Sequence, residues 1–241
     1  MQNGLYVSLS AQVALERRLE TIANNVANMN TVGYRAEGVS FETELARAGS
    51  NNLAYVSSGS SYISRQNGSM TKTGDPFDVA VQGTGWIAIS TPDGVAYTRD
   101  GRMRMSESGA LETLNGNPVL DAGGAPILLN PQASAPTISG DGMIAQDGKQ
   151  IGAVGLYTID DDAKLTRTGN SAVIPDKPAT PILDFTQNGI VQGFVEGANV
   201  NPIQEMTKLI TVTRTFDGVN QQVTQTEASL QDAIKTLGAS S

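Results

Sequence analysis

Apolar side chains recur at helical spacing near both ends of the chain, and the middle follows a different pattern. In the N-terminal part, the intervals between apolar residues alternate between four and three, which is the heptad pattern of a helix that packs against another helix. This stripe consists of Leu15, Leu19, Ile22, Val26 and Met29. The pattern predicts a helix of roughly 26 residues, with Gly33 as its stop signal.

A second helix is predicted from Pro202 to Leu237. Asn201 suits the N-cap position, Pro202 the first helical position and Gln204 the third. The heptad spacing that follows shifts by one residue after Thr213. Its apolar members are Ile203, Met206, Ile210, Phe216, Val223, Leu230, Ile234 and Leu237.

Either helix alone could pack against a domain of its own. Two long stripes at opposite ends of the chain favour pairing of the terminal helices with each other, because a single helix is marginal in water and cannot bury its own stripe. Two later positions of the second stripe are the polar residues Asn220 and Glu227. They indicate a seam that is wetter than that of a simple dimeric zipper.

The middle of the chain, from about Gly68 to Gly197, is rich in tight-turn signals. Seven Asn-Gly or Asp-Gly pairs separate short apolar or alternating runs, and such pairs supply the positive φ that two-residue hairpins need. This spacing predicts an antiparallel β domain. The Gly83-Thr84-Gly85 run joins two strand-like segments and opens no helix, so we interpret it as a turn and not as a phosphate loop.

The predicted fold class is therefore mainly β with helical termini: an antiparallel β-rich central domain flanked by N- and C-terminal α-helices that pair as a coiled coil. We expect an N-terminal helix in residues 1–33, a connecting segment in 34–70, a β-rich domain in 71–197 and a C-terminal helix in 198–241. The connecting segment is rich in Ser, Asn and Gly, as loops and linkers are. It is either a free linker or a segment that orders only against neighbouring subunits.

The composition narrows the chemistry that the chain can perform. Its 241 residues include no cysteine and no histidine, which excludes disulfides, thiol nucleophiles, zinc fingers and Ser-His-Asp catalysis. An enzyme of this composition would have to work with carboxylates, Lys, Tyr or Ser alone. The alternative of this class is a carbohydrate-active β enzyme that uses an acidic pair such as Asp78 and Asp100. The run of acids at 160–162 lacks the glycine and distant glutamate of a calcium loop, so we interpret it as a solvated turn. We expect no catalytic residue, no cofactor and no metal site.

The charge is acidic and unevenly distributed. The chain has a net charge of −8, which makes nucleic acid an unsuitable partner. Residues 71–196 carry a net charge of −7, whereas residues 1–70 sum to zero and residues 197–241 to −1. The start of the chain has no basic region, and no apolar run approaches the length of a membrane span. We expect no membrane span and, if the protein is exported, no cleaved signal peptide.

Three segments resemble the signatures of bacterial flagellar rod and hook proteins. Residues 22–34, IANNVANMNTVGY, are similar to the N-terminal signature of that family. Residues 77–86, FDVAVQGTGW, with residues 97–101, YTRDG, resemble its β-domain signature, and residues 196–206, EGANVNPIQEM, resemble its C-terminal one. The three segments stand in the family's order and span nearly the whole chain. Val26 in place of the usual Leu and Ala198 in place of the usual Ser are modest departures.

The resemblance implies a subunit of the flagellar basal-body rod, which is a hollow helical shaft that crosses the periplasm and transmits motor torque. It also implies export by the flagellar type III apparatus, an inner coiled-coil domain of terminal helices that lines the channel, and a β domain outside it. The implied partners are copies of the chain, neighbouring rod proteins and the export apparatus. Phe216 in the run Arg214–Asp217 favours the proximal-rod over the distal-rod member. A different tubular assembly protein, such as a phage-tail component, is a more remote alternative.

The resemblance gives three asparagines beside the first stripe a possible role in assembly. An amide donates and accepts hydrogen bonds without carrying charge, so a repeated subunit could satisfy it against its neighbour. The alternative is that these asparagines mark a fraying helix end. The expected interface consists of Leu15, Leu19, Ile22, Asn24, Asn25, Val26, Asn28 and Met29 in the first helix and Ile203, Met206, Ile210, Phe216, Val223, Leu230, Ile234 and Leu237 in the second.

Overall fold

The structure is a computed structural model, and it describes residues 2–41, 43–48, 51–56 and 59–238. The chain divides into two compact units. The helical unit comprises residues 1–27, 37–62 and 201–241, and the β unit comprises residues 28–36 and 63–200. Both terminal helices therefore belong to one unit, together with part of the segment that follows the first helix.

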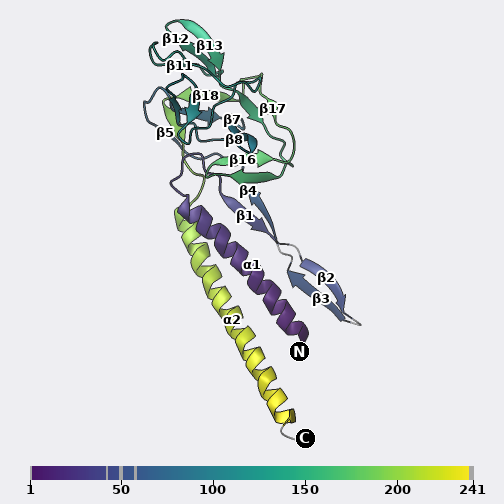
Figure 1. Ribbon diagram of the computed structural model, residues 1–241. Coiled ribbons are helices and arrows are strands. Elements are labelled where there is room, and N and C mark those ends of the chain that lie inside the picture. The colour runs from purple at the N-terminus through teal and green to yellow at the C-terminus, as the bar shows by residue number, and fades with distance from the viewer. Residues whose placement is uncertain (1, 42, 49–50, 57–58, 239–241) are drawn as a thin grey trace. The chain divides into compact units, whose positions relative to one another are not determined.

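The helical unit is built on two long helices that lie side by side (Figure 1). Helix α1 spans Gln2–Ala27 and helix α2 spans Pro202–Gly238. The side-chain oxygen of Asn201 accepts hydrogen bonds from the N–H groups of Ile203 (3.1 Å) and Gln204 (3.2 Å), so the predicted N-cap is confirmed. Helix α1 ends at Ala27, six residues before the predicted stop at Gly33.

The segment that was expected to be loop contains strands. Strand β1 (Glu37–Ser40) pairs with β4 (Ser60–Ile63), and β2 (Thr43–Ala48) pairs antiparallel with β3 (Asn51–Val56), which contacts α1. A two-stranded hairpin is marginal in water without further packing. The polar composition therefore concealed strands whose formation depends on partners that lie elsewhere in the chain.

The β unit confirms the prediction of an antiparallel β-rich centre. Its largest sheet has the order β15-β16-β8-β7-β14-β17. The strands of this sheet are β15 (Leu165–Thr168), β16 (Ala172–Pro175), β8 (Gly94–Thr98), β7 (Trp86–Thr91), β14 (Leu156–Thr158) and β17 (Thr180–Pro181). Smaller antiparallel groups are β5 (Met70–Lys72) with β19 (Phe194–Glu196), β6 (Val79–Gln82) with β18 (Gly189–Gln192), β9 (Met103–Met105) with β10 (Leu111–Thr113), and β11 (Thr137–Ile138) with β12 (Met143–Gln146) and β13 (Lys149–Ala153).

Strand β7, in the middle of the largest sheet, is buried on both faces. Side chains of a strand point alternately to its two sides, and those of β7 enter two different apolar clusters. Ile87 and Ile89 pack in one cluster, and Trp86 and Ala88 pack in the other. All four side chains are at most 3% exposed. This explains why the sequence of β7 is an almost continuous apolar run.

Two predicted turns have the backbone conformation that their residues suggest. Asp147 and Gly148 both have positive φ (48° and 76°) and join β12 to β13. Gly83 also has positive φ (83°) and lies in a turn between β6 and β7, as predicted for the Gly-Thr-Gly run.

Candidate assembly site

The pairing of α1 with α2 buries one stripe of each helix. The described side chains of α2 that are at least partly buried recur at alternating intervals of four and three residues. They are Glu205, Leu209, Val212, Phe216, Val219, Val223 and Thr226. On α1 the buried side chains are Ala14, Ile22 and Asn25. Asn25 near the end of α1 contacts Glu205 in the first turn of α2, so the two helices run antiparallel.

Only part of the predicted α2 stripe lies in this seam. Phe216 and Val223 are partly buried there. Ile203, Met206 and Ile210 instead lie on an exposed face, with 78%, 47% and 55% of their surface accessible. Three more of the predicted residues belong to the last part of α2, and their side chains lie outside the described residues: Leu230, Ile234 and Leu237.

Sequence reasoning missed five members of the α2 seam, namely Glu205, Leu209, Val212, Val219 and Thr226. A signal was present, because Leu209 lies one heptad before Phe216, and Val212 lies one heptad before Val219. Following that spacing back one more step leads to Glu205, whose charge hides its buried position. The one-residue shift that was inferred after Thr213 is therefore a change from one face of the helix to another.

The residues predicted for the N-terminal helix differ in how deeply they are buried. Ile22 is buried, with 3% of its surface exposed. The other apolar members are partly buried, and they are Leu15, Leu19, Val26 and Met29. Asn24 is exposed. The carboxamide oxygen of Asn28 accepts a hydrogen bond from the Thr31 hydroxyl (3.1 Å), just after the helix.

Asn25 is the asparagine that lies deepest in the helical unit, with 2% of its surface exposed. Its amide nitrogen donates to the carbonyl of Glu37 (2.9 Å) and to the carboxylate of Glu205 (3.2 Å). Its oxygen accepts from the N–H of Glu37 (2.8 Å). These groups belong to α1, β1 and α2 of one chain, so the Asn25 amide is used within its own subunit and not against a neighbour.

The β unit holds a buried cluster of charges that the sequence did not reveal. The Glu196 carboxylate lies 2.8 Å from the Arg35 guanidinium and 3.1 Å from that of Arg99. All three residues are about 1% exposed. Both guanidinium groups lie over the ring of Trp86, at 5.7 and 5.4 Å from its centroid.

Burial lowers the pKa of Arg35 to about 10, because desolvation disfavours its charged form. The Glu196 carboxylate opposes this change, and the positive charge of Arg99 adds to it. Burial also lowers the pKa of Arg99, again opposed by Glu196. Glu196 is thus the anion that compensates two buried cations. All three charged residues fall within or next to the motif segments, but charged side chains are ordinarily expected at the surface.

The same region of the β unit ties together the chain segments that follow α1 and precede α2. The N–H of Gly33 donates to the carbonyl of Glu196 (2.7 Å). The side chain of Asn199 accepts from the N–H of Ala36 (2.6 Å) and donates to the carbonyl of Gln66 (2.7 Å). Hydrogen bonds of the three motif segments therefore converge on one part of the β unit.

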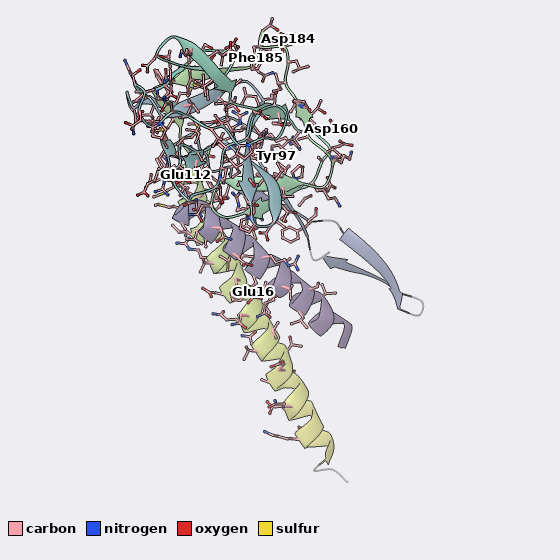
Figure 2. All side chains as sticks on the ribbon, turned by 45° about the horizontal axis from the view of Figure 1, so that its top comes forward. Glu16, Tyr97, Glu112, Asp160, Asp184 and Phe185 are labelled. Atoms are coloured by element: carbon pink, nitrogen blue, oxygen red, sulfur yellow. The ribbon has the colours of Figure 1, made fainter. Side chains whose placement is uncertain are left out.

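The acidic residues considered as candidates for chemistry have structural contacts. Asp100 forms a two-pronged ion pair with Arg102 (2.9 and 2.7 Å), and this hydrogen bonding, with the nearby charge of Asp78, raises the pKa of Arg102. Asp160 lies at the surface of the β unit (Figure 2), and the acids from 160 to 162 are exposed, as predicted for a solvated turn. Asp162 pairs with Lys177 (2.5 Å).

Neither described helix has a stretch that is both long and apolar enough to cross a membrane. Among the described residues, no group of three or more acidic side chains is placed to hold a metal ion.

Three parts of the chain match models of known protein families. Residues 5–35 match "Flagella basal body rod protein", residues 80–146 match "Flagellar hook protein FlgE/F/G D1 domain", and residues 191–237 match "Flagellar basal body rod FlgEFG protein C-terminal". The matched segments include most of both helices that form the seam and two strands of the largest sheet, β7 and β8.

Similar proteins cover the whole chain. It is 50% identical to the flagellar basal-body rod protein FlgF of Mesorhizobium japonicum and 48% identical to that of Rhizobium meliloti, in each case over 100% of both chains. It is 28% identical to the flagellar basal-body rod protein FlgG of Bacillus subtilis, over 97% of this chain and 98% of that protein.

Proposed function

The chain belongs to the family of flagellar basal-body rod proteins, a family of structural subunits and not of enzymes, and we propose that it forms the proximal part of the rod. Two observations support this position. The full-length FlgF relatives are 50% and 48% identical, whereas the FlgG relative from Bacillus subtilis is 28% identical. Phe216, in the run that distinguishes the two members, also favours the proximal-rod member.

The proposed contacts between subunits are made by the helices. The observation that carries this proposal is the exposed apolar face of α2, formed by Ile203, Met206 and Ile210. Burial of apolar surface is favourable by about 25 cal/mol per Å². A helix of another subunit that covers these side chains would therefore be stabilised. The seam of one chain and this outer face give α2 two apolar sides, which is what a helix inside a bundle of several subunits needs.

The proposed partners are copies of this chain, neighbouring rod proteins and the flagellar type III export apparatus. In this arrangement the helices of residues 1–33 and 198–241 form the inner wall of a hollow shaft that transmits torque across the periplasm, and the β-rich residues 71–197 face outward. The charge distribution supports it, because the −7 of residues 71–196 suits a solvated exterior and the nearly neutral arms can approach each other.

A charge placed on the exposed face tests this proposal. We expect Ile203→Asp with Ile210→Asp to abolish incorporation into the rod and hence motility, because burying the carboxylates against a neighbour would cost several kcal/mol per ion. The measurement is the amount of the variant that co-fractionates with isolated basal bodies in a strain lacking the native gene, together with swimming in soft agar.

Thr211→Asp is the matched control, because Thr211 is exposed on the same helix next to Ile210. It should leave incorporation at the parent level. Circular dichroism of the purified variants checks that both retain the parent's secondary structure. Incorporation of the double variant at the parent level would show that this face of α2 is not an assembly surface.

A further inference from the structure

Two of the most deeply buried side chains of the helix pair are polar. Among the described residues of α1 and α2, the buried side chains are Ala14, Ile22, Asn25, Glu205 and Val212. Asn25 is 2% exposed and Glu205 is 7% exposed. They lie opposite each other at the end of the seam where α1 finishes and α2 begins.

The contacts of this pair use all the main hydrogen-bonding groups of both side chains. Asn25 donates to one carboxylate oxygen of Glu205 (3.2 Å), and Lys208 donates to the other oxygen (2.6 Å). The remaining capacity of the Asn25 amide is taken by the N–H and C=O of Glu37 in β1. The pair therefore joins α1, α2 and the first strand after α1 at one point.

The rest of the seam does not define how far one helix is displaced along the other. The α2 stripe repeats every seven residues, so a slip of one heptad again sets its apolar side chains against α1, where Arg18 and Thr21 as well as alanines face it in the observed register. With equal rise per residue, the pairing of Asn25 with Glu205 also places Ala11 opposite Val219 and Ala14 opposite Phe216. After a slip of one heptad, Ala14 would face Val223.

The polar pair removes this ambiguity. In the slipped arrangement Asn25 would face Val212, and Glu205 would lie beyond the end of α1. A buried amide and a buried carboxylate would then each lose a partner, whereas the apolar contacts would change little. We propose that Asn25 and Glu205 are positioning residues that fix the register of α1 against α2. This inference concerns the helix pair of a single chain and holds independently of the proposed position in the rod.

A distance between spin labels on the two helices measures the register directly. The chain has no cysteine, so Glu20→Cys and Gln225→Cys introduce two unique labelling sites, both at exposed positions. Pulsed electron paramagnetic resonance on the full-length protein should give one narrow distance distribution. In the double variant Asn25→Leu with Glu205→Leu, we expect a second population displaced by about 10 Å, which is one heptad of helix rise.

Asn220→Leu with Glu227→Leu is the matched control. It makes the same two replacements on α2 at exposed positions, and its distance distribution should remain that of the parent. A broad or multiple distribution in the parent protein, or a single unchanged distribution in Asn25→Leu with Glu205→Leu, overturns the proposal.

A relocated pair separates register from folding. Arg18 and Val212 face each other in the observed register, so Arg18→Asn with Val212→Glu, added to Asn25→Leu with Glu205→Leu, moves the polar pair one heptad along the seam. This quadruple variant lacks the contacts of Asn25 with β1 but should recover a single distance. The double variant Asn25→Leu with Glu205→Leu could also lose helical circular dichroism, that is, fail to fold. A single inter-label distance in the quadruple variant would then still support the proposal. A quadruple variant without a single distance overturns it.

Discussion

Glu196 is the residue on which the interior of the β unit depends most directly. It is the carboxylate that contacts both Arg35 and Arg99, and it also accepts a hydrogen bond from the N–H of Gly68 (2.8 Å). Burial lowers the pKa of both arginines, and the nearby carboxylate opposes this change in each case. Removing the negative charge would leave two buried cations without an anion.

We therefore expect Glu196→Gln to destabilise the β unit by about 3–5 kcal/mol, the cost typical of breaking a buried ion pair by removing one partner. The chain contains a single tryptophan, Trp86, which lies against both guanidinium groups. Its fluorescence during denaturant unfolding reports on the surroundings of the two arginines. The measurement gives the change in the free energy of unfolding of the β unit.

Glu112→Gln provides the comparison for this measurement. Glu112 pairs with Arg104 at 2.8 Å, but the arginine side chain is 55% exposed. Solvent screens such a pair, so the change should cost at most about 1 kcal/mol. Equal free energies of unfolding for the two variants would show that the buried cluster is not held together by Glu196.

Gly33 is placed where a side chain cannot be accommodated. Its φ is +69°, and a Cβ atom there would come within 2.5 Å of the backbone of Arg99 and Asp100. Gly124 has a similar φ of +81° but open space around it. We expect Gly33→Ala to cost about 2–5 kcal/mol, because it combines backbone strain with overpacking, and Gly124→Ala about 1–2 kcal/mol. Thermal unfolding of both variants tests this order, and a smaller loss for Gly33→Ala contradicts it.

At the scale of the elements, the sequence predicts what local chemistry decides. The start of α2 follows from Asn201 and Pro202, and the turn between β12 and β13 follows from Asp147 and Gly148. Cap and turn residues act through their own backbone and its nearest neighbours, so their effect can be read from a short stretch of chain.

The sequence cannot decide which apolar face of α2 packs within the chain. Ile203, Met206 and Ile210 form one face, and Leu209, Val212 and Phe216 form another. The choice between them depends on α1, and the buried Glu205 at the start of the seam obscures the second face further. Helical spacing thus identifies candidate surfaces but not their partners.

Strands β1 to β4 and the Arg35–Glu196–Arg99 cluster were missed for a related reason. The strands lie in a segment rich in Ser, Asn and Gly, and β1 is held by hydrogen bonds to Asn25, which lies 12 residues away. Glu196 and its two arginines come from three distant parts of the chain. Such features depend on which remote segments of the chain pair with each other. Composition and periodicity carry no information about that pairing.

At the scale of the whole molecule, the helices of one chain are unequal in length. Helix α2 has 37 residues and α1 has 26. Since Asn25 faces Glu205, Gln2 at the start of α1 lies opposite about Ala228. Helix α2 continues past that point, as Figure 1 shows. This last part carries Leu230 and Leu237, which lie one and two heptads after Val223 of the seam, and also Ile234.

An extension of this kind suits contact with another subunit, because no part of α1 reaches it. We expect a chain that ends at Glu227 to fold with close to the parent's thermal stability but to be absent from isolated basal bodies, since the helical unit loses only the contacts at the very start of α1. A full-length variant with Leu230→Gln, Ile234→Gln and Leu237→Gln separates the two possible causes. If the apolar side chains are required, this variant should also be absent from basal bodies, and if only helix length matters, it should be incorporated. Rods that contain the shortened chain at the parent level would show that the extension is not used in assembly.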